Sequence, residues 1–225
     1  EGVVPSLDEL KTMIKLVKDK GGKFLLDGAR VANALVYWGL ELSDLKDLHI
    51  DGFTFGTSKK GGLAEVVGIY DKKAAKRLPE EAASFGHISS KTSPLALVTG
   101  LFLSTNYWKI EAASENRSAK TFAEAVQELG IHPYFEVCSN MVFIKLPPDV
   151  LEQLATHPQF GGVYSDYGRD EDISRIVFTG FQTPESLSAM ISALKEALAS
   201  RGEGDPLDAI NGRLTDLIEN QTSTQ

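Results

Sequence analysis

The heptapeptide Phe55-Gly56-Thr57-Ser58-Lys59-Lys60-Gly61 places a lysine directly after a short apolar run and before a second predicted strand at residues 64–70. Lysine normally keeps its ammonium group in water while its stem lies along apolar surface. At a strand end between glycine and hydroxyl residues, the amine of Lys59 can instead be partly desolvated. Desolvation lowers the pKa of a lysine, and only a neutral amine attacks a carbonyl to form a Schiff base. The alternative is that Lys59 and Lys60 form a solvated turn, and the heptapeptide alone favours this alternative.

The composition limits the class of protein. The chain has 225 residues and a net charge of -8, which disfavours a general nucleic-acid binder because phosphate contacts need a local excess of Lys and Arg. A single cysteine, Cys138, excludes an internal disulfide framework and is typical of a reducing, cytoplasmic compartment. No apolar run is long enough to span a bilayer and no signal peptide is recognisable, so no membrane partner is expected. Because the chain begins at Glu1 rather than Met, we interpret it as a processed or truncated product.

The first third of the chain alternates helix and strand. Ser6 and Glu9 have the spacing of a capping box, which predicts a helix from residue 7 onwards. Residues 23–26 are apolar after their lysine, which is typical of a parallel strand covered on both faces. A helix from residue 31 and a strand at residues 52–56 follow, which is the order of an open α/β sheet. The expected buried side of the first helix consists of Leu7, Leu10, Met13, Ile14 and Val17.

Two ionisable side chains are expected on one edge of this sheet. Ligands of open α/β sheets bind outside the carboxyl ends of the strands. Asp27 follows one predicted strand and Lys59 follows the next, so a carboxylate and an amine should lie close together. The alternative for Asp27 is a plain helix N-cap, because aspartate is a preferred cap residue, and Arg30 would then be an exposed residue of the first helical turn.

The remainder of the chain changes its hydrophobic period near Pro133. Before it, residues 71–85 are predicted as helical turns interrupted at Pro79, and residues 95–130 as two helices. After it, a repeated order of two strands and a helix predicts a small α+β domain with an antiparallel sheet, followed by a polar tail from residue 201. The expected buried side of the long second helix consists of Trp108, Ile110, Phe122, Val126 and Leu129. The expected elements of the small domain are strands at residues 134–137, 142–146, 161–165 and 175–179 and helices at residues 148–155 and 184–198.

Three segments of the chain resemble one family together. They are Leu26-Asp27-Gly28-Ala29-Arg30-Val31-Ala32-Asn33-Ala34, the lysine heptapeptide, and Gly86-His87-Ile88-Ser89-Ser90-Lys91. In this order and spacing they resemble the low-specificity threonine aldolases, which belong to the β-eliminating-lyase branch of the fold-type I pyridoxal-phosphate enzymes. The Asp-Gly-Ala-Arg stretch is the most specific of these matches.

The resemblance covers nearly the whole chain and implies an α/β fold. It implies the C-terminal part of the large domain of a pyridoxal-phosphate-dependent transferase of the aminotransferase type I class, followed by a small α+β C-terminal domain. The implied division is residues 1–104 as a partial large cofactor-binding domain, residues 105–130 as a connecting long helix, residues 131–200 as the small domain and residues 201–225 as the tail.

The resemblance implies a role for each of five residues. Lys59 would form the internal aldimine with pyridoxal 5'-phosphate. Asp27 would pair with the pyridinium nitrogen, which makes the ring an electron sink. Arg30 and Arg175 would bind the substrate carboxylate through bidentate contacts, and Ser58 would hydrogen-bond the cofactor phosphate.

The chain also departs from the family pattern. Family members often have asparagine at the position of Lys60, which is interpreted as a bystander, and commonly arginine at the position of Ser93. The family's N-terminal portion of roughly a hundred residues, which brings a small-residue phosphate loop and a ring that stacks on the cofactor, is missing here. None of the four histidines is a convincing stacking partner, and no catalytic role is expected for His87. Cys138 is interpreted as a small buried hydrophobe.

The implied activity is cleavage of the Cα–Cβ bond of β-hydroxy-α-amino acids of the threonine or allo-threonine type, giving glycine and an aldehyde. The expected partners are an amino-acid substrate and further copies of the chain in a dimer or tetramer, without metal or nucleic acid. Two alternatives stay open. One is another pyridoxal-phosphate β-eliminating lyase or an aminotransferase-like enzyme, because the base that acts on the β-hydroxyl is not identifiable. The other is a non-catalytic fragment that needs the missing N-terminal half.

Overall fold

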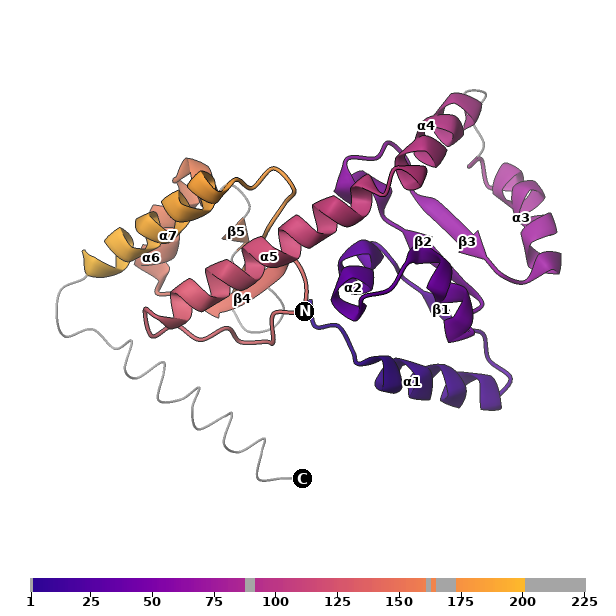
Figure 1. Ribbon diagram of the computed structural model, residues 1–225, viewed down its shortest axis with the longest axis horizontal. Coiled ribbons are helices and arrows are strands. Elements are labelled where there is room, and N and C mark those ends of the chain that lie inside the picture. The colour runs from indigo at the N-terminus through magenta and orange to yellow at the C-terminus, as the bar shows by residue number, and fades with distance from the viewer. Residues whose placement is uncertain (1, 88–91, 161–162, 165–172, 201–225) are drawn as a thin grey trace. The chain divides into compact units, whose positions relative to one another are not determined.

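The computed structural model describes residues 2–87, 92–160, 163–164 and 173–200 (Figure 1). Its contacts divide the chain into two compact units, Val4–Ser114 and Glu1–Val3 with Glu115–Gln225. Each unit has a hydrophobic core of its own, and the long helix α5 (Tyr107–Gln127) contributes side chains to both cores. Within the described ranges, no helix is long and apolar enough to cross a bilayer.

The first unit is built on a three-stranded sheet in the order β1-β2-β3. Strands β1 (Leu25–Leu26) and β2 (Gly52–Phe55) are parallel, and β3 (Val66–Ile69) runs antiparallel to β2. The parallel pair confirms the prediction from the sequence and brings the carboxyl ends of β1 and β2 to one edge of the sheet. The helical elements of this unit, before α5, are α1 (Leu7–Asp19), α2 (Val31–Trp38), η1 (Leu42–Leu48), η2 (Thr57–Lys60), α3 (Lys72–Ser84) and α4 (Thr92–Ser104).

Local signals in the sequence explain how this unit is built. The capping box at the start of α1 is confirmed, because the Glu9 amide donates to Ser6 Oγ and the Ser6 amide donates to the Glu9 carboxylate. The core then forms where helices meet the sheet. Phe55, at the end of β2, packs edge-on against Trp108 with ring centroids 5.5 Å apart. The other buried members of this core are Leu10, Ile14, Val31, Ala32, Leu35, Leu45, Leu48, Ile50 and Ala112.

Several predicted details of the first unit are wrong. Leu25 is 66% exposed, so β1 is not covered on both faces by the described residues. Helix α3 continues through Pro79, where the predicted helical turns were expected to be interrupted. Met13 of α1 and Ile110 of α5 lie outside the cores, at 42% and 65% exposure.

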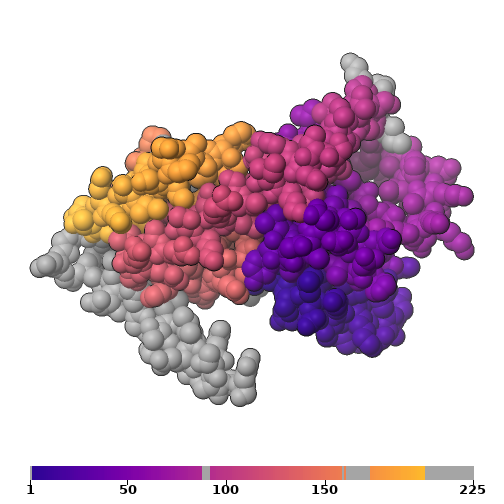
Figure 2. Space-filling model, in the orientation of Figure 1, coloured from indigo at the N-terminus to yellow at the C-terminus, as the bar shows by residue number. Residues whose placement is uncertain are grey.

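The apolar helix α4 is exposed on most of its surface. Leu97 and Leu101 are 66% and 58% exposed, and Thr99 is the one residue of the helix that is buried. In the space-filling view its atoms, in magenta, lie at the surface (Figure 2). A helix that is hydrophobic all round is usually covered on more than one side. The described chain does not supply that cover.

The second unit carries an antiparallel sheet in the order β4-β6-β5, formed by β4 (Met141–Lys145), β6 (Ile173–Val177) and β5 (Val163–Tyr164). This sheet and the two helices beside it, α6 (Pro148–Ala155) and α7 (Pro184–Ala199), confirm the predicted α+β pattern. A short turn, η3 (Pro158–Phe160), precedes β5. The core of the unit includes Phe122 and Val126 of α5, as the sequence predicts. The tail from residue 201 lies outside the described residues.

The predicted strand at residues 134–137 is not a strand. One ladder-like bond joins it to β4, from the Tyr134 amide to the Phe143 carbonyl at 2.7 Å. Its aromatic residues pack as rings instead, since Phe135 lies edge-on to Tyr134 at 4.9 Å and to Phe143 at 5.3 Å. The segment therefore packs against β4 without pairing with it as a strand.

Candidate active site

Hydrogen bonds and close backbone contacts hold the turn after β1 to the end of β2 and the turn that follows it. The Gly28 amide donates to Thr54 Oγ1 at 2.8 Å, and the Gly56 amide donates to the Gly28 carbonyl at 3.1 Å. A Cβ on Gly28 would lie 1.8 Å from the Thr54 carbonyl oxygen, and a Cβ on Gly56 would lie 2.2 Å from the Ala29 carbonyl oxygen. Both positions therefore require glycine. The two turns carry the carboxylate and the lysine that the sequence predicts at this edge.

Asp27 is exposed, and hydrogen bonds converge on one of its two oxygens. Oδ1 accepts from the Ala29 amide at 3.2 Å and from Thr54 Oγ1 at 3.3 Å. Among the described residues, Oδ2 accepts no hydrogen bond. The alternative of a plain helix N-cap is not what forms, because the N-cap position of α2 is Arg30 and no side chain caps that helix. Asp27 instead closes a local turn through the amide two residues on.

The two adjacent lysines of η2 lie in different surroundings. Lys59 is exposed, whereas Lys60 is only 3% exposed. The partial desolvation expected for Lys59 therefore falls on its neighbour in the described chain. Consecutive residues of a tight 3-10 turn point in different directions, so one lysine can face solvent while the next is buried.

The other predicted site residues are spread over both units. Ser58 is exposed and its hydroxyl donates to the Glu65 carboxylate, so a phosphate at this position would meet a like charge. Arg30 is half-buried and immediately precedes α2. Arg175 is half-buried on β6 in the second unit, opposite Phe143 in the register of the sheet.

The third predicted segment lies mostly outside the described residues. Its histidine, His87, is exposed and its amide donates to the Ala82 carbonyl at the end of α3, while residues 88–91 are not described. Cys138 is 3% exposed and is a free thiol, as expected for a small buried hydrophobe.

Two chemical features of the site fit pyridoxal phosphate. The unoccupied lone pairs of Asp27 Oδ2 match a ring nitrogen that carries a proton. The exposed primary amine of Lys59 matches an aldehyde. Both groups project from turns that the Gly28 and Gly56 contacts keep close together. The fit is weaker at the phosphate, where Ser58 is already bonded to Glu65.

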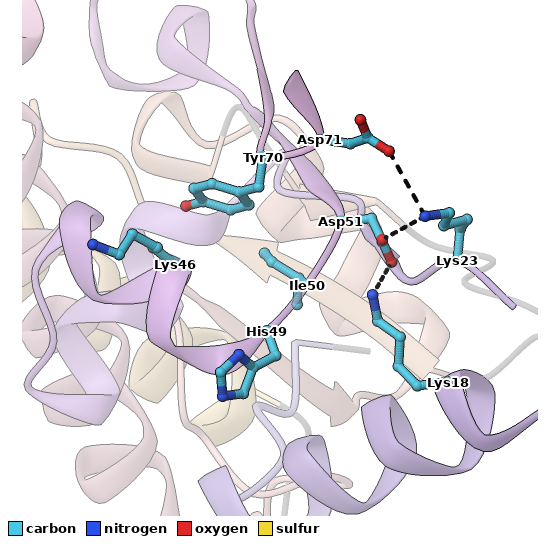
Figure 3. Close-up of a pocket in the computed structure, with 8 residues that line it drawn as sticks. All are labelled: Lys18, Lys23, Lys46, His49, Ile50, Asp51, Tyr70 and Asp71. Carbon is cyan, nitrogen blue, oxygen red and sulfur yellow. Dashed lines mark hydrogen bonds and ion pairs between the residues drawn. The ribbon is translucent and has the colours of Figure 1, made fainter. Parts of the chain in front are cut away.

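A hollow of about 500 Å³ lies at the amino-terminal edge of the parallel pair and is lined by none of the predicted site residues (Figure 3). In the close-up Lys18 and Lys23 both reach Asp51, with Nζ to Oδ distances of 2.5 and 3.3 Å. Burial raises the pKa of the Asp51 carboxyl, but hydrogen bonds from Lys18, the Phe24 amide and Lys23 outweigh it and lower the pKa to about 2.

This cluster was not predicted from the sequence, because its charges come from α1 and from the residues just before β1 and β2. The one available signal is that a charged residue lies close before each strand, Lys23 before β1 and Asp51 before β2. Lys23 also approaches Asp71 at 3.9 Å. The ion pairs of Asp51 hold the amino ends of the strands to α1. Because carboxylates already neutralise two lysines of the hollow, it is a poor match for an anionic cofactor.

Solved structures with the same fold include threonine aldolases. The chain matches the threonine aldolase of Leishmania major with a TM-score of 0.74 and 22% identity, over 84% of this chain and 56% of that one. It matches a putative L-allo-threonine aldolase of Listeria monocytogenes with a TM-score of 0.69 and 18% identity, over 87% of this chain and 58% of that one. A serine palmitoyltransferase of Sphingomonas wittichii has a TM-score of 0.62 at 12% identity, over 85% of this chain and 51% of that one. These proteins share the fold-type I architecture of pyridoxal-phosphate enzymes, so the predicted fold class is confirmed.

Sequence comparison identifies the family. The chain is 30% identical over 156 residues to the low specificity L-threonine aldolase of Pseudomonas aeruginosa, which covers 68% of this chain and 45% of that protein. It is 29% identical, with the same coverage, to the corresponding enzyme of a Pseudomonas species. The chain thus spans less than half the length of these curated relatives. The family model for β-eliminating lyases matches residues 1–147. This range includes the turn after β1, with Asp27, and the turn after β2, with Lys59, which we call the two locked turns. The chain therefore belongs to the β-eliminating lyase family, whose members depend on pyridoxal phosphate.

Proposed function

We propose that this chain is the lysine-bearing part of a pyridoxal-phosphate lyase that splits β-hydroxy-α-amino acids of the threonine type into glycine and an aldehyde. The observation that carries the proposal is the pair of locked turns, which hold Asp27 and Lys59 at the carboxyl ends of two parallel strands. The substrate class comes from the relatives named low specificity L-threonine aldolase. Because the chain spans 45% of their length, its activity alone is part of the proposal.

The two residues would divide the work on the cofactor. Pyridoxal phosphate, when bound, supplies an aldehyde and an electron-withdrawing ring. Lys59 would hold the cofactor through its amine, and its exposure gives the amine access to the aldehyde. Asp27 Oδ2 would accept the ring N–H and keep that proton on the nitrogen, because a nearby carboxylate favours the charged form of a base.

The substrate would be oriented by arginines. Arg30 and Arg175 would bind its carboxylate, since a guanidinium matches a carboxylate with two parallel hydrogen bonds. Fixing the carboxylate fixes the orientation of the bond to be broken relative to the ring. Ser58 would contact the cofactor phosphate once its hydroxyl turns away from Glu65.

Reductive trapping tests the proposal directly. The chain is incubated with pyridoxal phosphate, reduced with borohydride, digested and mapped by mass spectrometry. We expect one pyridoxyl group, on Lys59, that is lost in Lys59→Ala and kept in Lys60→Ala, the adjacent control. A label on Lys60 would contradict the assigned register. Scattered labelling of surface lysines would contradict the site. Release of acetaldehyde from L-threonine or L-allo-threonine, followed with a coupled dehydrogenase, then tests the reaction.

A second candidate is a chain that is inactive alone and acts only with a further polypeptide that completes the large domain. The observation that favours it is the exposure of the apolar helix α4, whose Leu97 and Leu101 are 66% and 58% exposed. Size-exclusion chromatography combined with absorbance of the bound cofactor separates the two candidates. A chain sufficient for catalysis elutes as a defined species that carries the cofactor. A chain that needs a further polypeptide elutes without cofactor, as aggregates.

A further inference from the structure

Thr54 links the two locked turns through a single hydroxyl. It lies on β2, one residue before Phe55, and its Oγ1 accepts from the Gly28 amide at 2.8 Å. The same oxygen lies 3.3 Å from Asp27 Oδ1 and donates to it. A hydroxyl has one proton, and an oxygen that already accepts from an amide offers that proton to the next acceptor. The proton of Thr54 is therefore aimed at the carboxylate.

The other restraint on Asp27 is local. Its carboxylate is exposed, so packing does little to fix the rotation of its side chain. The Ala29 amide belongs to the same turn and moves with it. Thr54 is the partner that joins the carboxylate to the neighbouring strand. Since both donors act on Oδ1, the free oxygen Oδ2 takes a defined position.

We propose that Thr54 is a positioning residue of the cofactor site, whose hydroxyl holds Asp27 so that Oδ2 meets the ring nitrogen of pyridoxal phosphate. This inference rests on the function proposed above for Asp27. A purely structural role for Thr54 would act through its other bond, which anchors the Gly28 amide, and would affect any ligand of the site alike. Under the positioning role, loss of the hydroxyl weakens only a cofactor that has the ring nitrogen. Under the structural role, it weakens a cofactor with or without that nitrogen.

The experiment compares two variants and two cofactors. Thr54→Val removes the hydroxyl and keeps the β-branched shape, and Thr54→Ser keeps the hydroxyl. Dissociation constants are measured by fluorescence titration for pyridoxal phosphate and for its 1-deaza analogue, in which carbon replaces the ring nitrogen. We expect Thr54→Val to weaken the binding of pyridoxal phosphate about tenfold, which is the size of one hydrogen bond to a charged group. The dissociation constant of Thr54→Ser should stay within about twofold of the unaltered chain's. The analogue should bind all three proteins equally.

The outcomes separate this inference from the proposed function. If Thr54→Val weakens both cofactors equally, or neither, the positioning role is wrong while the site stands. If the unaltered chain neither binds pyridoxal phosphate nor is labelled on Lys59, the proposed function is wrong and the inference falls with it. Melting curves of the cofactor-free proteins accompany the titrations. If Thr54→Val melts like Thr54→Ser, a selective loss of pyridoxal phosphate affinity is due to the carboxylate and not to unfolding.

Discussion

Replacing Asp51 by asparagine should destabilise the first unit in a way that depends on pH. The Asp51 carboxylate accepts from Lys18 Nζ at 2.5 Å and from the Phe24 amide at 2.7 Å, and it pairs with Lys23. Its side chain is only 14% exposed. It thereby joins α1, the approach to β1 and the start of β2. Asparagine keeps the shape and can still accept from the Phe24 amide, so Asp51→Asn removes the charge alone.

The magnitude follows from the pKa of Asp51, which the fold lowers from 3.8 to about 2. Taken in full, this difference corresponds to about 2.4 kcal/mol of stability. Lys18 and Lys23 are themselves 35% and 67% exposed, so solvent screening reduces the expected loss to about 1–1.5 kcal/mol. Because the pKa is lower in the folded chain, the unfolded chain takes up the proton first as the pH falls. The contribution is therefore complete above about pH 5 and disappears progressively toward about pH 2.

Urea denaturation followed by tryptophan fluorescence measures this effect in the relevant unit. The chain has 2 tryptophans, and both Trp38 and Trp108 lie in Val4–Ser114. Asp19→Asn is the matched control, since the Lys15–Asp19 pair of α1 is 75% and 57% exposed and should contribute less than about 0.5 kcal/mol. The reasoning is refuted if Asp51→Asn costs as much near pH 2.5 as near pH 7, or no more than Asp19→Asn near pH 7.

Three further changes test the packing. Gly28→Ala should cost about 2–3 kcal/mol in the same urea assay, because its Cβ would lie 1.8 Å from the Thr54 carbonyl oxygen, and a cost below that of an exposed substitution would contradict the locked turns. Phe122→Ala should cost about 3–5 kcal/mol by far-ultraviolet circular dichroism, because Phe122 is fully buried beside Phe178. Thr183→Ala should cost about 1 kcal/mol through loss of the cap on the Ser186 amide of α7, and Thr183→Ser should restore it.

The sequence predicted the parts of the fold that depend on neighbouring residues. The capping box of α1 joins Ser6 to Glu9, three residues away, so its pattern is complete in the sequence. The apolar run that ends at Leu26 predicted a parallel strand, and β1 pairs in parallel with β2. The roles of Asp27 and Lys59 in binding a cofactor stay predictions, although the turns that carry them are adjacent.

The features that the sequence did not predict depend on register and on distant contacts. The Thr54 hydroxyl reaches Asp27 only because β1 and β2 pair with Leu26 opposite Phe53. The Asp51 cluster joins residues of α1 to the start of β2, and charges on separate elements do not show their pairing in the sequence. The burial of Lys60 beside the exposed Lys59 depends on the direction of a tight turn that a run of two lysines does not indicate.

Helix α4 shows a different limit of prediction from the sequence, which concerns what covers an apolar surface. Its sequence, Thr92-Ser93-Pro94-Leu95-Ala96-Leu97-Val98-Thr99-Gly100-Leu101-Phe102-Leu103-Ser104, is apolar around the whole helix and predicts burial on several sides. In the described chain Leu97 and Leu101 remain exposed, which costs about 1.5–3 kcal/mol per side chain relative to full burial. An apolar pattern predicts that a surface is more stable when buried, but it does not predict which segment or partner buries it. Leu25 on β1 shows the same difference: the apolar pattern predicted a strand covered on both faces, and the described residues leave Leu25 66% exposed.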